Sequence, residues 1–409
     1  MFDITSRLNV TKTLGSTVML GIILFLSLPA ATYAAPSPAL SLKANPVKVG
    51  KGGNATLSWA SQNTKSCTAS GGWSGSKGTS GSQTVKNITS SQTYKLTCAG
   101  TTKNVSAAVK VAVIATPPPP PPGPLVVGLN VQQHMRTFDA AGQAFTRELG
   151  AHSIRLAHDT RDHDFGVNWA DQNGVGVIFM LGYGGGVNVK TASGRQAYAD
   201  RSADLAWKYG SKIEYYQVWN EWNGGFGLAC DWKQPPCNDA AMYTDLLCKT
   251  YEAIKAVRPN AKVAGGVVAG ANEKFITGML DAGAGDCMDV LDLHLYVYRQ
   301  GWPGHVAANA PASVGVDKFI EVINARENLV RAKTGRTIPI LVSEAGFHGA
   351  NEQLGADYIT ELYRRSSTVP FLEGIWWYQL EDAGKGGFGL LRSNNTKKPA
   401  FAAYKAAAE

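Results

Sequence analysis

Eight short apolar runs, each followed by a segment long enough for a helix, recur after residue 125 of this chain. Each run is rich in Val, Ile, Leu or aromatic residues and has the length of a strand that is buried on both faces. Strands that alternate with helices form parallel sheets, and eight such units predict a closed (β/α)8 barrel, the TIM barrel, in an α/β fold class. The runs are Leu125–Asn130, Ser153–Ala157, Val175–Leu181, Glu214–Trp219, Lys262–Val268, Val290–Tyr296, Ile338–Ser343 and Gly374–Gln379.

A doubly wound sheet with a glycine-rich nucleotide loop is the alternative to the barrel. The stretch from Gly182 through Tyr183 to Gly186 is the candidate for such a loop. It has neither the GxGxxG spacing of dinucleotide-binding folds nor the GK[ST] ending of a P-loop. We therefore interpret it as a loop that approaches a substrate, with Tyr183 as a candidate binding residue.

The N-terminus has the pattern of a secretory signal. Arg7 and Lys12 precede an apolar run from Val18 to Pro29, and small residues follow up to Ala34. We expect residues 1–34 to be a signal peptide that is removed on export. An uncleaved anchor is the alternative, but the run is shorter than the ~20 apolar residues of a spanning helix.

The sequence of residues 36–115 predicts a small all-β domain. Short alternating stretches such as Ala55–Trp59 and Tyr94–Cys98 are typical of half-buried antiparallel strands. A Trp near the first Cys and a Tyr before the second resemble the immunoglobulin-like sandwich, although Trp59 precedes Cys67 instead of lying between the two cysteines. We expect an immunoglobulin-like sandwich whose topology is left open.

Successive prolines in residues 116–124 predict an extended, semi-rigid spacer, because each ring fixes φ and removes a backbone donor. The spacer divides the sandwich at 36–115 from the barrel at 125–409. A ligand for a proline-reading domain is the alternative function for this segment.

The formal charge of +8 belongs to the sandwich. Residues 36–115 contain nine lysines and neither Asp nor Glu, so the remainder of the chain is nearly neutral. Such a surface attracts polyanions, and we expect it to tether the chain to an acidic polymer. The alternative is that exposed lysines only protect the strand edges from aggregation.

Export makes the six cysteines candidates for disulfides, and none forms a CxxC pair. We expect Cys67 to pair with Cys98, because they are alone in their domain. The other four cysteines allow three connectivities. The one that we expect joins Cys230 to Cys237 and Cys248 to Cys287.

Two glutamates stand at the ends of predicted strands. Glu221 follows Asn220 after the fourth run, and Glu344 follows the seventh. The carboxyl ends of barrel strands converge on one face, and strands four and seven lie across that mouth. Two carboxyl groups facing one cleft are what glycoside hydrolysis requires, at ~5–5.5 Å apart for a reaction with retention.

The segment Trp219–Asn220–Glu221 and the strand-terminal Glu344 resemble glycoside hydrolase clan A, the (β/α)8 retaining enzymes. The resemblance covers the barrel from about Leu125 onward and is nearest to the family 39 group of β-xylosidases, iduronidases and exopolysaccharide hydrolases. It implies that Glu221 is the acid/base and Glu344 the nucleophile. Trp222 departs from the pattern, since a Pro is common at its position.

The same resemblance implies substrate-binding roles for further residues. Arg155 would keep the nucleophile ionised, His294 and Tyr296 match a His-x-Tyr pattern, and Asn220 would hold the sugar 2-hydroxyl. Trp377 would form the sugar platform while its neighbour Trp376 packs in the shell. The alternatives are a solvated charge for each Glu, a structural ion pair for Arg155, a core position for His294, and exchanged roles for the two tryptophans.

Four aromatic residues, Trp169, Tyr183, Trp222 and Trp302, follow predicted strands, where rings stack on sugars or pack in the core. Of these, Tyr183 and Trp222 are the candidate substrate-binding residues. The segment His158–Asp164 contains potential metal ligands, but its spacing matches no known site. We expect neither a metal nor another cofactor.

These features predict a secreted or periplasmic retaining glycosidase, with attachment to a cell surface or matrix as a further alternative. Its partner would be an extracellular polysaccharide. One alternative is that this polysaccharide is acidic. We expect a monomer that binds no nucleic acid and does not insert into a membrane. A catalytically inactive carbohydrate-binding or matrix protein, and an adhesin acting through its sandwich, are the competing functions.

Overall fold

The structure is a computed structural model that describes residues 36–50, 53–114, 124–131, 138–157, 163–183, 186–228, 238–302, 304–382 and 387–409. The predicted signal peptide at 1–34 lies outside the described residues. So do the predicted Cys230–Cys237 pair, almost all of the proline-rich spacer and residues 158–162 of the His/Asp-rich segment.

Eight parallel strands close into a barrel in sequence order, which confirms the predicted (β/α)8 fold. Each observed strand overlaps one of the eight apolar runs. They are β9 (Val126–Asn130), β10 (Ser153–Ala157), β11 (Gly176–Met180), β12 (Tyr215–Gln217), β13 (Lys262–Ala269), β14 (Val290–Leu295), β15 (Ile340–Ala345) and β16 (Leu372–Trp377).

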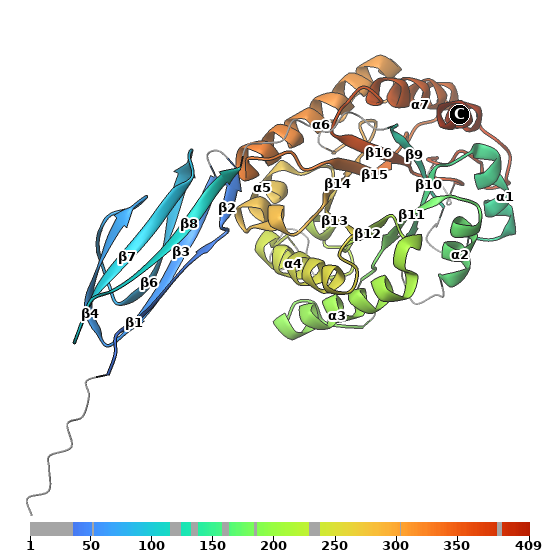
Figure 1. Ribbon diagram of the computed structural model, residues 1–409. Coiled ribbons are helices and arrows are strands. Elements are labelled where there is room, and N and C mark those ends of the chain that lie inside the picture. Colours follow the sequence, from blue (N-terminus) through green and yellow to red (C-terminus); the bar gives the residue numbers. More distant parts are fainter. Residues whose placement is uncertain are drawn as a thin grey trace, which may run out of the picture.

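Helices surround this ring of strands (Figure 1). Side chains just before several helices accept from their first free N–H groups, as Asp139 does from Gly142 and Thr191 from Gly194. The α-helices are α1 (Ala140–Leu149), α2 (Asp164–Gln172), α3 (Ala192–Tyr209), α4 (Ala240–Val257), α5 (Glu273–Asp281), α6 (Ala312–Thr334), α7 (Glu352–Ser366) and α8 (Pro399–Ala408). Short 3-10 helices are η1 (Gly210–Lys212), η2 (Trp222–Gly224) and η3 (Ala284–Asp286).

The lower part of the barrel interior is filled by side chains. Trp376 of β16 meets Tyr215 of β12 with ring centroids 6.3 Å apart, across the barrel from one another. Gly128 of β9 makes room for this tryptophan, because a Cβ there would lie 2.3 Å from the Trp376 ring. Because the base of the interior is filled in this way, a ligand inside the barrel is expected at its mouth, where the carboxyl ends of the strands lie.

The N-terminal strands form two sheets over one buried core, with strand orders β1-β3-β6 and β2-β8-β7-β4-β5. Trp59, Leu57 and Leu96 lie in this core. The strands, drawn in blue to cyan in Figure 1, are β1 (Ala39–Asn45), β2 (Lys48–Gly50), β3 (Gly53–Gln62), β4 (Thr64–Gly71), β5 (Gly75–Lys77), β6 (Ser80–Ile88), β7 (Gln92–Gly100) and β8 (Val105–Ile114).

Two of the predicted cysteine pairs are disulfides. Cys67–Cys98 joins directly paired residues of β4 and β7, so it lies within one sheet. In antibody domains the equivalent bond joins the two sheets, and this sandwich therefore differs from that arrangement. Cys248–Cys287 joins α4 to the residue after η3.

Among the described residues, no helix is both long and apolar enough to cross a membrane.

Candidate active site

Glu344 reaches the barrel mouth through an irregularity in β15. Leu293 of β14 pairs with Val342, whereas the next residue, His294, pairs with Glu344, so the register passes over Ser343. Ser343 nevertheless faces inward, since its Oγ accepts from Gln217 over 2.8 Å. Two consecutive side chains of β15 thus face the barrel interior, and Glu344 takes the position above Ser343.

Glu221 is held in a left-handed loop at the end of β12. Its φ is 48° and that of Trp219 is 68°, conformations that cost a non-glycine residue about 1–3 kcal/mol. The Glu221 N–H donates to the Val267 carbonyl over 3.0 Å, which ties the loop to the neighbouring strand. The strained backbone turns the carboxyl group of Glu221 toward His294, whose Nδ1 lies 2.7 Å from Oε1.

The two glutamates and His294 form one cluster. His294 Nδ1 also lies 3.5 Å from Oε2 of Glu344. One carboxylate oxygen of Glu221 and one of Glu344 lie within 4.8 Å of each other. This separation is close to the ~5–5.5 Å of carboxyl pairs that act with retention and is shorter than the ~6.5–9.5 Å of inverting pairs.

Both oxygens of Glu344 accept short hydrogen bonds. Arg155 Nη1 donates to Oε1 over 2.6 Å, and the Tyr296 hydroxyl donates to Oε2 over 2.6 Å. Burial alone would raise the pKa of Glu344, but the charges of His294 and Arg155 and the two hydrogen bonds outweigh it and lower the pKa. Burial and the neighbouring Glu344 charge raise the pKa of Tyr296 well above 10, so its hydroxyl stays a donor.

Arg155 is fixed by bonds to two further strands, β9 and β12, and to the loop after β12. Its Nε donates to Gln217, Nη1 donates also to Asn130, and Nη2 donates to Asn220 over 2.8 Å. Gln217 in turn donates to the buried Asp292 of β14. Because every one of these partners is itself held, the guanidinium cannot turn away from Glu344.

His294 is fully buried between the two carboxyl groups. Burial opposes its charged form, but the charges of Glu344 and Glu221 raise its pKa above the ordinary value of 6.5. Its Nε2 has no hydrogen-bond partner among the described residues. The structure therefore brings His294 into the site instead of the apolar core.

Asn220 and Tyr183 form the side of the site next to Glu221. The Asn220 amide nitrogen lies 3.0 Å from the Tyr183 hydroxyl, while its oxygen accepts from Arg155. Tyr183 is 38% exposed, so a ligand at the mouth can reach its ring. Burial of the hydroxyl, the largest influence, raises the pKa of Tyr183.

Two of the predicted sugar-binding tryptophans do not reach the mouth, and these predictions are wrong. Trp222 is 0% exposed and packs between Trp219 and Tyr243. Trp377 is 1% exposed, because it points out of the barrel toward Tyr358 of α7. Its neighbour Trp376 points inward but lies in the filled base, so neither residue is the platform. Trp169 is also buried, against Phe138.

Two residues at the mouth, Tyr378 and Arg299, were not predicted from the sequence, and Trp302 was predicted only as one of four aromatic residues that follow strands. Tyr378, directly after β16, lies with its ring centroid 6.0 Å from that of Tyr296, and burial together with Glu344 raises its pKa to about 12. Arg299 is exposed and lies 4.5 Å over the ring of Trp302, which itself contacts Tyr296. Counting residues past the end of β16 would have found Tyr378. No local pattern predicts the turn after β14 that brings Arg299 over the ring of Trp302.

Glu221, His294 and Glu344 are also close enough to hold a metal ion. Their surroundings fit an ion poorly, because the Arg155 guanidinium lies 2.6 Å from Glu344 and would repel a cation. Both Glu344 oxygens would also have to weaken the hydrogen bonds that they accept. Of the His/Asp-rich segment, the described Asp164 pairs with Lys208 of α3.

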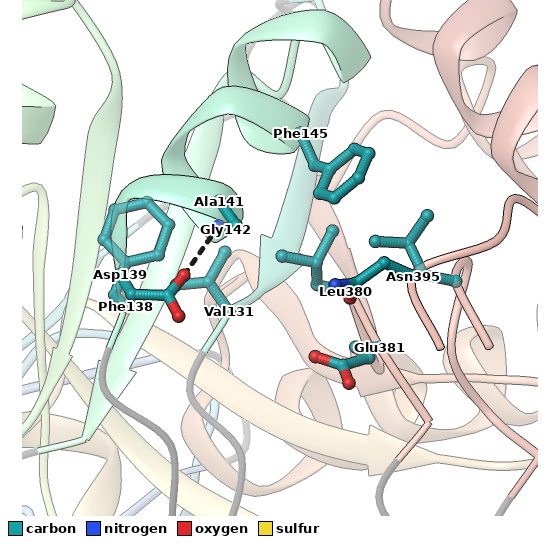
Figure 2. Close-up of a pocket in the computed structure, with 10 residues that line it drawn as sticks. Val131, Phe138, Asp139, Ala141, Gly142, Phe145, Leu380, Glu381 and Asn395 are labelled. Atoms are coloured by element: carbon teal, nitrogen blue, oxygen red, sulfur yellow. Dashed lines mark hydrogen bonds between the residues drawn. The ribbon is translucent and has the colours of Figure 1, made fainter. Parts of the chain in front are cut away.

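A pocket elsewhere on the molecule does not contain this cluster. Figure 2 shows it between the start of α1 and the segment after β16, with walls formed by Phe138, Phe145 and Leu380. Asp139, which lines this pocket and directly precedes α1, caps that helix by accepting from the Gly142 N–H. The Glu221–Glu344 cluster is therefore the candidate functional site.

Comparison with protein-family models and with curated proteins gives no match. Solved structures do match. A family 39 glycoside hydrolase from the gut symbiont Bacteroides cellulosilyticus WH2 has a TM-score of 0.54 and 19% identity, and the match covers 90% of this chain and 82% of that one.

Two further solved structures match a smaller share of this chain. A monomeric beta-xylosidase from Caulobacter crescentus CB15 has a TM-score of 0.53 and 20% identity, over 70% of this chain and 68% of that one. A glucosidase from Croceicoccus marinus has a TM-score of 0.53 and 13% identity, over 72% and 69%. At these identities the likeness shows the fold.

Proposed function

We propose that the chain is a retaining glycoside hydrolase of the family 39-like group in clan A, which cleaves an extracellular polysaccharide. The observation that carries the proposal is the pair Glu221 and Glu344, with carboxylate oxygens within 4.8 Å at the mouth of the barrel. The similar structures support it, since they are described as a family 39 glycoside hydrolase, a xylosidase and a glucosidase.

The surroundings of Glu344 support the role of nucleophile. Arg155 and Tyr296 stabilise the ionised form of Glu344, as a nucleophile requires. In the first step Glu344 bonds to the anomeric carbon while the bond to the leaving oxygen breaks, and Glu221 gives its proton to that oxygen. In the second step Glu221 takes a proton from water, whose oxygen replaces Glu344 on the anomeric carbon.

The remaining contacts supply positioning. Asn220 is held by Arg155 and Tyr183, and we propose that it binds the sugar 2-hydroxyl, a contact that strengthens in the transition state. Tyr296 orients Glu344, and His294 orients Glu221. Tyr183, which is exposed at the mouth, is the aromatic residue that we propose as a sugar contact.

We propose further that residues 1–34 direct export and that the sandwich is an immunoglobulin-like accessory domain. The two disulfides of the described residues are compatible with an oxidising compartment. Edman sequencing of the protein exported from an expressing cell would locate the mature N-terminus.

The proposed reaction is tested with aryl glycosides of several sugars and with polysaccharides, by measuring released aglycone and reducing ends. Proton NMR of the first product should show the anomeric configuration of the substrate. An inverted first product would contradict the double displacement. Absence of hydrolysis across the panel, with binding retained, would favour an inactive carbohydrate-binding protein.

A further inference from the structure

The lysines of the sandwich are available for a partner. Residues 36–115 contain nine lysines and no Arg, Asp or Glu, so the domain has no carboxylate side chain of its own to neutralise them. Among the described residues, none of these lysines takes part in an ion pair. Their charge is therefore directed to solvent or to a binding partner.

Three of the lysines form a diagonal row on the outer face of the five-stranded sheet. Lys48 of β2 pairs with Ala112 of β8, two residues from Lys110. Lys110 pairs with Thr93 of β7, two residues from Lys95. Residues offset by two on adjacent strands share a face and lie ~7–8 Å apart. The row thus crosses three neighbouring strands.

Alternation along each strand confirms that this row faces outward. Val49, Val111 and Leu96, each next to one of the lysines, are buried in the sandwich core. All three lysines are exposed. We define Lys48, Lys95 and Lys110 as the lysine row.

The chemistry of this face limits the class of partner. The aromatic residues Trp59, Trp73 and Tyr94 are buried in the core, so neutral sugars find no described ring to stack on. The lack of Arg disfavours phosphate recognition by bidentate guanidinium groups, and the lack of exposed aromatic rings disfavours a membrane surface. Point charges in a row fit a polymer with regularly spaced carboxylates.

We propose that the lysine row binds an anionic, carboxylate-bearing polysaccharide. The choice of a polysaccharide rests on the proposed function of the barrel, because a polymer held by the sandwich is presented to a site that cuts polymers of the same chemical class. Binding of this kind raises the effective concentration of substrate at the barrel without any new contact there.

The experiment measures co-sedimentation of the full chain, carrying Glu344→Gln to prevent cleavage, with insoluble polygalacturonate at 0.1 M and 1 M NaCl. The test variant is Lys48→Gln/Lys95→Gln/Lys110→Gln. The matched control is Lys43→Gln/Lys86→Gln/Lys103→Gln, which removes the same charge from exposed lysines outside the row. We expect the test variant to lose about tenfold in affinity and the control less than about threefold, with binding abolished at high salt.

Three outcomes would overturn the proposal: equal losses in both triple variants, binding that survives 1 M salt, or tighter binding to duplex DNA or to phosphatidylserine vesicles than to polygalacturonate. Thermal unfolding checks that both variants remain folded. Turnover of a soluble aryl glycoside, measured without the Glu344 change, separates the two proposals. The barrel could hydrolyse no glycoside while polygalacturonate binding still depends on the lysine row. That result would contradict the proposed reaction and support the binding site on the sandwich.

Discussion

The Arg155 guanidinium donates to Oε1 of Glu344 over 2.6 Å, and the two side chains are only 7% and 12% exposed. A charge pair with so little solvent between its members controls the protonation of the carboxyl group. It also couples catalysis to stability, because removing one member leaves the other charge buried without a partner.

Arg155→Met should move the acidic limb of the pH–rate profile to higher pH. Without the guanidinium the pKa of Glu344 rises, so the nucleophile is protonated at a pH where the native enzyme is still active. The free energy of unfolding should fall by about 3–5 kcal/mol. Arg195→Met is the control, since Arg195 pairs with Asp245 of α4 instead of a site residue, and it should leave the limb unchanged. An unchanged acidic limb in Arg155→Met would contradict the electrostatic role.

Glu344→Ala should reduce kcat at least about 10³-fold. It should also lower the temperature of thermal unfolding, because the Arg155 guanidinium then lies buried without its partner. Added azide should restore turnover of an activated aryl glycoside and yield a glycosyl azide of inverted configuration, because a small anion fits the space of the missing carboxylate. Glu327→Gln, a buried glutamate on α6, is the control and should keep its activity. Near-native turnover of Glu344→Ala would remove the nucleophile assignment.

Glu221→Gln should slow substrates with poor leaving groups by about 10²–10⁴-fold and activated aryl glycosides much less, since only the former need a proton in the first step. Rates are measured across a series of phenols with different acidities. A uniform loss over the whole series would argue against the acid role.

His294→Gln should reduce stability in a defined pH window. The raised pKa of His294 contributes stability that is fully present below 6.5 and is lost as pH rises through the native value. The lowered pKa of Glu344 contributes stability that is present above 4.5 and is lost as pH falls through its native value. The difference between native and variant should therefore be largest between these limits and shrink on both sides. Urea unfolding over this range tests it, and a difference independent of pH would be inconsistent with the charge cluster.

Trp377→Ala should lower the free energy of unfolding by about 3–5 kcal/mol, because it empties a buried site between β16 and α7. Its KM for an aryl glycoside should stay near the native value. Tyr183→Ala should do the reverse, raising KM with little change in stability, because its ring is exposed at the mouth. A large rise of KM in folded Trp377→Ala would restore that residue to the binding site.

The local sequence pattern determined the barrel and the placement of Glu221 and Glu344 on the same face of it. Alternation of apolar runs with helix-length segments is a short-range property, and it placed all eight strands. The position of Glu221 and Glu344 at run ends followed from it, because parallel strands bring their carboxyl ends to one face. The Cys67–Cys98 bond was predicted on a different ground, because these two cysteines are alone in their domain.

Only the tertiary structure decided which way several side chains point. A strand alternates with period two, so one register shift exchanges inward and outward positions. The shift that passes over Ser343 turns Glu344 inward, and the unbroken alternation in β16 turns Trp377 outward. Trp222 is buried because the left-handed turn at Glu221 directs it beneath the loop. Bonds between strands far apart in the sequence, as from Arg155 to Glu344 and from Asn130 to the Ser343 carbonyl, depend on barrel closure, which no local pattern contains.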